Sequence, residues 1–98
     1  MNRAAKGRRL EHKTMKRLEA IGYACTRSSA SKGVWDVIAI RGQDIRLIQV
    51  KANRPPPPAE RDSMQEFRAP DVCSKEFWVW KDREREPHIF EFTGGKWE

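Results

Sequence analysis

The chain has 98 residues, of which 38% are hydrophobic and 35% are charged, and its formal net charge is +6. This length allows one domain, residues 1–98, with a thin core, and no apolar run approaches the length of a membrane span. No apolar segment follows the basic N-terminus, so the start does not resemble a secretion signal. Cys25 and Cys73 have neither CxxC nor zinc-type spacing, and we expect reduced thiols in a cytoplasmic protein.

Residues 4–21 have the pattern of an amphipathic helix that stops before Gly22. Its apolar stripe is formed by Leu10, Thr14, Leu18 and Ile21. Glu11 lies beside Leu10, at the edge of this stripe. The predicted helix therefore offers one carboxylate that can reach inward, toward whatever the helix packs on.

The same helix carries most of the positive charge. The first 17 residues contain a single acid and seven basic residues, Arg3, Lys6, Arg8, Arg9, Lys13, Lys16 and Arg17. A localised positive field suits a polyanion such as DNA or RNA. A solvated helix face would have the same composition, so charge alone leaves both interpretations open.

The central part of the chain predicts three strands. A short strand covers residues 23–28, and a loop of small residues leads to a second strand over 34–41. Gly42 and Gln43 then form a turn into a partner strand over 44–51. Both strands of this hairpin are apolar on both faces, as expected for central strands that are covered on each side.

The last part predicts a helix and two more strands. After a stiff run of prolines, a helix covers residues 59–67, and strands follow over 75–81 and 88–92. In the first of these strands, the aromatic stretch 77–80 places two tryptophans on one face. We expect them in the core, although a dimer surface or a stacking platform for bases is an alternative. The element order predicts an α/β domain with a mixed sheet flanked by helices.

The predicted hairpin brings three polar residues together. With Gly42 and Gln43 in the turn, Asp36 faces Gln49, and Lys51 lies on the same face. Charged groups in apolar strands are costly unless they are paired or bound to a metal ion. A salt bridge between Asp36 and Lys51 is the structural alternative to a metal site.

The oxygen atoms at this end of the hairpin suit magnesium, which prefers hard oxygen ligands. We expect a Mg²⁺ site, with Mn²⁺ as a substitute, made by Asp36, the amide carbonyl of Gln49, the backbone carbonyl of Val50 and Glu11. Lys51 can position an attacking water or stabilise negative charge on a phosphate. The chemistry predicted is metal-assisted hydrolysis of a phosphodiester, with Glu11, Asp36, Gln49 and Lys51 as the catalytic set.

Asp36, twelve intervening residues and then Gln49-Val50-Lys51 resemble the D…(E/Q)xK signature of the PD-(D/E)xK nuclease superfamily. Two further segments, Gly7–Glu11 and Arg27–Asp36, resemble the archaeal-type Holliday junction resolvases within it. This resemblance implies a restriction-endonuclease-like fold with an α-β-β-β-α-β core. It also implies a metal-site role for Glu11. In two places the chain departs from the pattern, because Trp35 replaces the usual proline and Gln49 replaces the usual glutamate.

The function implied is an endonuclease selective for branched DNA, acting as a homodimer that nicks two strands symmetrically. The expected DNA contacts are Arg3, Lys6, Arg8, Arg9, Arg27 and Ser31. One alternative is a VRR-like or restriction-type nuclease that acts on another DNA geometry. Another is a non-catalytic DNA-binding relic of the fold.

Overall fold

The protein is described here from a computed structural model, which covers residues 3–28 and 33–98. Its elements are α1 (Arg3–Glu19), β1 (Ala24–Arg27), β2 (Val37–Arg41), β3 (Asp44–Ala52), α2 (Pro58–Glu66), β4 (Cys73–Trp80), β5 (His88–Thr93) and β6 (Lys96–Trp97). The predicted order of helices and strands is confirmed, and only β6 was not predicted. Neither helix in the described part of the chain is long and apolar enough to cross a membrane.

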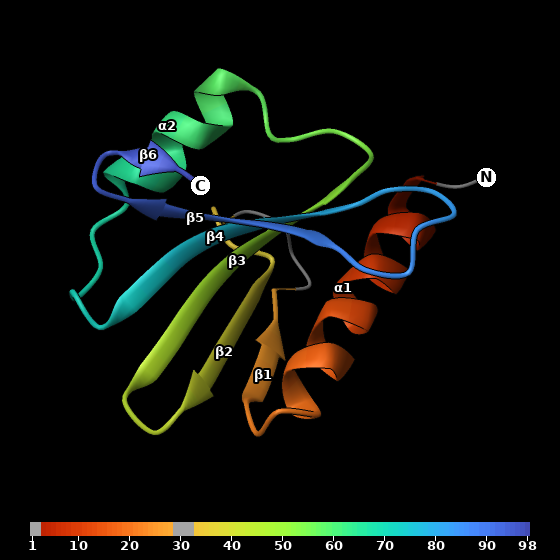
Figure 1. The fold of residues 1–98 in the computed structure, drawn as a ribbon, viewed down its shortest axis with the longest axis horizontal. Coiled ribbons are helices and arrows are strands. Elements are labelled where there is room, and N and C mark those ends of the chain that lie inside the picture. Colours follow the sequence, from red (N-terminus) through yellow and green to blue (C-terminus); the bar gives the residue numbers. More distant parts are fainter. Residues whose placement is uncertain (1–2, 29–32) are drawn as a thin grey trace.

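The strands of the described residues form one mixed sheet in the order β1-β2-β3-β4-β5-β6 (Figure 1). Neighbouring strands are antiparallel except β3 and β4, which are parallel. A parallel pair needs a crossover connection, and the segment containing α2 supplies it. The predicted α/β fold with a mixed sheet flanked by helices is therefore confirmed.

The two helices pack on opposite faces of the sheet. Leu10 and Leu18 of α1 share one buried cluster with Trp78 and Trp80 of β4. On the other face, Met64 of α2 packs in a second cluster that includes Phe77, Val79 and Trp35. Because side chains alternate along a strand, β4 contributes to both layers of the core.

Trp78 and Trp80 are 1% and 3% exposed, so they belong to the core as expected. Their burial corrects the suggestion that the stretch 77–80 is a dimer surface. The physical reason is topological, because β4 lies between β3 and β5 and is covered on both faces. Trp80 is also tied to α1, since its Nε1 donates to Thr14 Oγ1 at 2.9 Å.

Ile21 was wrongly included in the buried stripe of the first helix. The helix ends at Glu19, and Gly22 follows with a φ of 96°, a conformation that favours glycine. This early turn leaves Ile21 54% exposed, and Tyr23 is buried in its place. The rest of the stripe, Leu10, Thr14 and Leu18, is buried as predicted.

The hairpin of β2 and β3 has the predicted register. Val37 pairs with Ile48 and Arg41 with Asp44, so the turn is made by Gly42 and Gln43. The strand β2 begins at Val37, three residues later than predicted, and Asp36 lies just before it. There the side chain of Asp36, rather than a backbone carbonyl, accepts the N–H of Val50.

A buried ion pair joins β3 to β4 beneath Tyr23. The guanidinium of Arg46 donates from Nε and Nη2 to the two carboxylate oxygens of Glu76, both at 2.8 Å. Glu76 is 2% exposed and also accepts from Ser74 Oγ and from Trp78 Nε1. These contacts satisfy the carboxylate and raise the pKa of Arg46, chiefly through its hydrogen bonds to Glu76. The pair fixes the two parallel strands at their N-terminal ends.

Removing the Glu76 carboxylate should destabilise the fold strongly. Glu76→Ala leaves Arg46 as a half-buried, unpaired charge, and we expect a loss of about 3 kcal/mol in the free energy of unfolding. Urea denaturation measures this loss. Asp62→Asn, which removes an exposed carboxylate on α2, is the control, and a loss no larger than that of the control would contradict this account.

Candidate active site

Asp36 is held in place from three sides at the start of β2. Its backbone N–H donates to Ile48 O at 2.9 Å, and its carbonyl accepts from Ser28 N at 2.9 Å. Its Oδ2 accepts from the backbone N–H of Val50 at 2.8 Å. The carboxylate is therefore fixed where the chain enters β2 beside the end of β3, and it needs no side-chain partner to stay there.

The electrostatic surroundings of Asp36 disfavour an isolated negative charge. Burial raises the pKa of this carboxyl most, and the nearby carboxylates of Glu11 and Glu60 raise it further. The hydrogen bond from Val50 and the charge of Lys51 act in the opposite direction and lower the pKa. A bound cation would favour the charged form of Asp36.

Gln49 faces the same region but lacks one hydrogen-bond partner. The side chain is 8% exposed, and its Nε2 donates to the carbonyl of Val34 at 3.2 Å. Its Oε1 is buried without a partner among the described residues. A buried polar atom left in this state costs about 1–3 kcal/mol. A neutral oxygen that needs a donor or a cation fits the hard ligand set of Mg²⁺.

Lys51 pairs with a residue that the sequence analysis did not single out. Its Nζ lies 2.7 Å from Oε1 of Glu60, in the first turn of α2. Within the described residues, Lys51 pairs with Glu60, and no salt bridge joins it to Asp36, the pairing that was the structural alternative to a metal site. The sequence contains an indication of this role, because Glu60 is an acid that follows the run of prolines in the first turn of a helix.

Glu11 and Arg27 meet at the edge of α1 and β1. Arg27 Nη1 lies 3.2 Å from Glu11 Oε1, and both side chains are largely buried. The charge of Glu11 also contributes to the raised pKa of Asp36. Arg27 is engaged with Glu11 rather than free at the surface. Ser31, the last predicted DNA contact, lies outside the described residues.

No group of three or more His, Cys, Asp or Glu side chains within residues 3–28 and 33–98 is arranged to hold a metal ion by itself. This finding follows from the composition of the predicted site, in which a glutamine and a backbone carbonyl stand beside the acids. The donor set is nevertheless made of hard oxygens. The free thiols of Cys25 and Cys73 are not part of it.

A basic groove runs from the N-terminal end of α1 to the end of β3. Its volume is about 550 Å³, and it is lined by Arg3, Lys6, Gly7, Leu10, Val50, Lys51, Ala52, Asn53 and Arg54. Two of the predicted DNA contacts, Arg3 and Lys6, thus share a surface with Lys51. Arg54 was not predicted, and Lys6 also pairs with Asp82 at 3.0 Å. Arg8 and Arg9 are exposed on α1 and do not line this groove.

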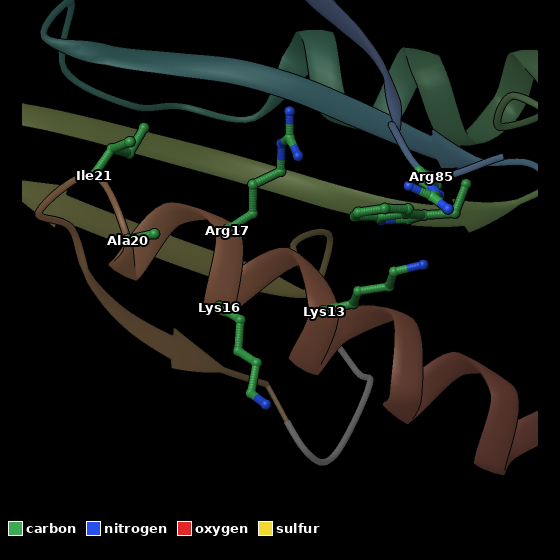
Figure 2. A pocket seen from close by; sticks show the side chains of 7 residues that line it. Lys13, Lys16, Arg17, Ala20, Ile21 and Arg85 are labelled. Carbon is green, nitrogen blue, oxygen red and sulfur yellow. The ribbon is translucent and has the colours of Figure 1, made fainter.

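A second basic depression lies along the other half of α1 (Figure 2). It measures about 550 Å³ and is lined by Lys13, Lys16, Arg17, Ala20, Ile21, Trp80 and Arg85. Figure 2 shows Lys13 extending toward Arg85, and Lys16 pointing away from both. The ammonium of Lys13 lies 4.6 Å from the centre of the Trp80 ring, a cation–π distance. Its lining among the described residues contains no carboxylate, so it is distinct in chemistry from the site around Asp36.

Comparison with known proteins agrees with this geometry. The family model described as archaeal Holliday junction resolvase (Hjc) matches residues 2–57, a span that includes Glu11, Asp36, Gln49 and Lys51. The structure is similar to that of Archaeoglobus fulgidus Hjc, a Holliday junction resolvase from an archaeal hyperthermophile. The two share 22% sequence identity with a TM-score of 0.69, over 88% of this chain and 72% of that chain.

A search of curated proteins gave no match to the sequence. The family match, which covers more than half of the chain, and the shared fold agree with each other. The chain therefore belongs to the archaeal Holliday junction resolvase family of the PD-(D/E)xK nuclease superfamily.

Proposed function

We propose that this protein is a metal-dependent DNA endonuclease, with residues 1–98 as one nuclease domain, that hydrolyses phosphodiester bonds in branched DNA. The observation that carries the proposal is the arrangement at the end of the hairpin. A half-buried carboxylate, an amide oxygen with no partner among the described residues and a lysine lie there, within a chain of the resolvase family. The similar Archaeoglobus protein is a Holliday junction resolvase, which supports a four-way junction as the substrate.

The residues have separate roles in this proposal. Glu11, Asp36, Gln49 Oε1 and the backbone carbonyl of Val50 hold Mg²⁺, or Mn²⁺ in its place. A bound divalent ion makes water a better nucleophile and polarises a phosphoryl oxygen. Lys51 holds the attacking water in position or stabilises the negative charge that develops on the phosphate. The hydrogen bond from Val50 keeps Asp36 oriented before any substrate arrives.

The basic groove gives the DNA backbone a path to these residues. Arg3, Lys6 and Arg54 line it together with Lys51, so phosphates held in the groove would lie next to the proposed catalytic group. Arg8 and Arg9 extend the positive surface outward along α1. Arg27 and Ser31 are proposed to contact the DNA near the scissile phosphate. A DNA substrate is consistent with the cytoplasmic location expected from the sequence.

We propose a homodimer as the active form, because symmetric cleavage of a junction needs two sites. The dimer surface is not the aromatic stretch of β4, which is buried within each chain. A VRR-like or restriction-type nuclease that acts on another DNA geometry is the main alternative. A non-catalytic DNA-binding relic is the second, and the retained Asp36, Glu11 and Lys51 weigh against it.

Purified protein should cleave a four-way junction in Mg²⁺ or Mn²⁺, and EDTA should stop the reaction. Gel analysis of a four-way junction, a flap, a linear duplex and a single strand separates the alternatives. Faster cleavage of the junction supports a resolvase, and faster cleavage of another form supports a different nuclease. Absence of cleavage of every form with both metals would leave only the non-catalytic relic.

Asp36→Asn and Lys51→Met should each reduce cleavage on the order of a hundredfold or more, because each removes an interaction with the reacting groups. Junction affinity, measured by gel shift, should change little. Asp71→Asn, which removes an exposed carboxylate before β4, is the matched control and should retain full activity. Retained cleavage in either site variant would exclude the assigned role of that residue.

Replacing Arg8 and Arg9 together with alanine should weaken binding to all DNA sequences alike. Each lost phosphate contact should flatten the log–log dependence of affinity on salt by about 0.9 on duplex DNA. Arg68→Ala with Lys96→Ala removes the same charge from exposed positions outside α1 and serves as the control. An unchanged slope in the α1 variant would show that Arg8 and Arg9 are only a solvated helix face.

Light scattering at micromolar concentration should give the mass of a dimer, with and without junction DNA. The expectation follows from the need for two sites on one junction. A monomeric mass under both conditions would refute the homodimer and weaken the assignment of the junction as the substrate.

A further inference from the structure

A small pocket lies beside the candidate active site, on the face of the sheet covered by α2. Its volume is about 230 Å³, and it is lined by Gly33, Val34, Gln49, Glu60 and Ser63. Three of these side chains carry oxygen atoms, the amide of Gln49, the carboxylate of Glu60 and the hydroxyl of Ser63. The Oε1 of Gln49 is buried without a partner among the described residues.

Glu60 also contacts the proposed catalytic lysine. Its Oε1 lies 2.7 Å from Lys51 Nζ. Glu60 is therefore adjacent to Lys51 and shares a pocket with Gln49. A salt bridge between Glu60 and Lys51 does not provide a partner for Gln49 Oε1, whereas a cation bound by Glu60 in the shared pocket would.

The position of Glu60 depends on how α2 is anchored. Trp35 packs edge-on against Phe67, the C-cap of α2, with ring centres 5.6 Å apart. Met64 is fully buried in the same cluster as Trp35. Trp35 and Gln49 are the two departures from the family pattern. Trp35 helps to anchor α2, the helix that carries Glu60. Gln49 lacks the negative charge of the usual glutamate, and the carboxylate of Glu60 could replace that charge.

We propose that Glu60 is a ligand of the metal site and supplies the carboxylate that Gln49 lacks. This inference rests on the proposed function and extends it, because it adds a residue from α2 to a site otherwise built from α1 and the hairpin. Glu60 and Gln49 line one pocket, so the carboxylate of Glu60 would add a negative charge beside the neutral oxygen of Gln49. A carboxylate oxygen is a hard ligand of the kind that Mg²⁺ and Mn²⁺ prefer.

Calorimetric titration with MnCl₂ tests the assignment without relying on cleavage. Glu60→Gln should weaken Mn²⁺ binding by about tenfold or more, in the range seen when a group that supports a metal site is removed. Adding Gln49→Glu to this variant should restore the affinity, because the carboxylate returns at the other position. Glu66→Gln, an exposed residue of the same helix, is the matched control and should bind Mn²⁺ as the unaltered protein does. Equal affinity in Glu60→Gln and the unaltered protein would overturn the proposal.

A second variant separates direct ligation from a role in positioning Lys51. Glu60→Cys places a thiolate at the pocket, and a thiolate bound to Cd²⁺ gives an ultraviolet charge-transfer band. The band should be stronger than any band of the Glu66→Cys control, which shares the native Cys25 and Cys73 as background. Equal bands in the two variants would show that residue 60 does not touch the metal.

Different results would contradict the proposed nuclease function and the role of Glu60 as a metal ligand. If the unaltered protein cuts a four-way junction and Asp36→Asn loses both metal binding and cleavage, the proposed function stands. Unchanged Mn²⁺ affinity in Glu60→Gln would then overturn the role of Glu60 alone. If the unaltered protein neither binds Mn²⁺ nor cuts DNA, both the proposed function and the added ligand are wrong. Thermal unfolding followed by circular dichroism checks that each variant keeps its fold.

Discussion

The register of β2 against β3 determines where every candidate ligand of the hairpin lies. With Val37 opposite Ile48, Asp36 comes beside Gln49, and its carboxylate reaches the N–H of Val50. A slip of one residue would turn the polar side chains of β3 to the opposite face of the sheet. The two-residue turn of Gly42 and Gln43, in which Gly42 has a φ of 61°, fixes the register against such a slip.

Around this hairpin, the fold combines a stable framework with an electrostatically unsatisfied site. The buried carboxylate of Glu76 is saturated with hydrogen bonds and belongs to the framework that joins β3 to β4. Asp36, beside the other end of β3, is half-buried, and nearby acids raise its pKa; the Oε1 of Gln49 has no partner among the described residues. Such unsatisfied groups are costly in a fold and are characteristic of sites that bind ligands. The contrast supports a metal site at the C-terminal end of β3.

The sequence predicted the parts of this arrangement that depend on local patterns. The spacing around Gly42 was sufficient for the register, and alternation was sufficient to assign Trp78 and Trp80 to one face. It could not give the partner of Lys51, because Glu60 reaches it only through the packing of α2 on the sheet. The sequence also did not show that the first helix ends at Glu19, because Ile21 still fits the helical period.

The most direct test of the central claim is the location of the bound ion in solution. Paramagnetic Mn²⁺ broadens nuclear magnetic resonance signals of nearby nuclei, and a titration of isotope-labelled protein shows which backbone amides respond first. Our account predicts that the amides of Asp36, Gln49, Val50 and Lys51 broaden at the lowest Mn²⁺ concentrations, before those beside exposed acids such as Glu84. Broadening centred on exposed acids, with the hairpin end unaffected, would contradict a metal centre built on the register of β2 and β3.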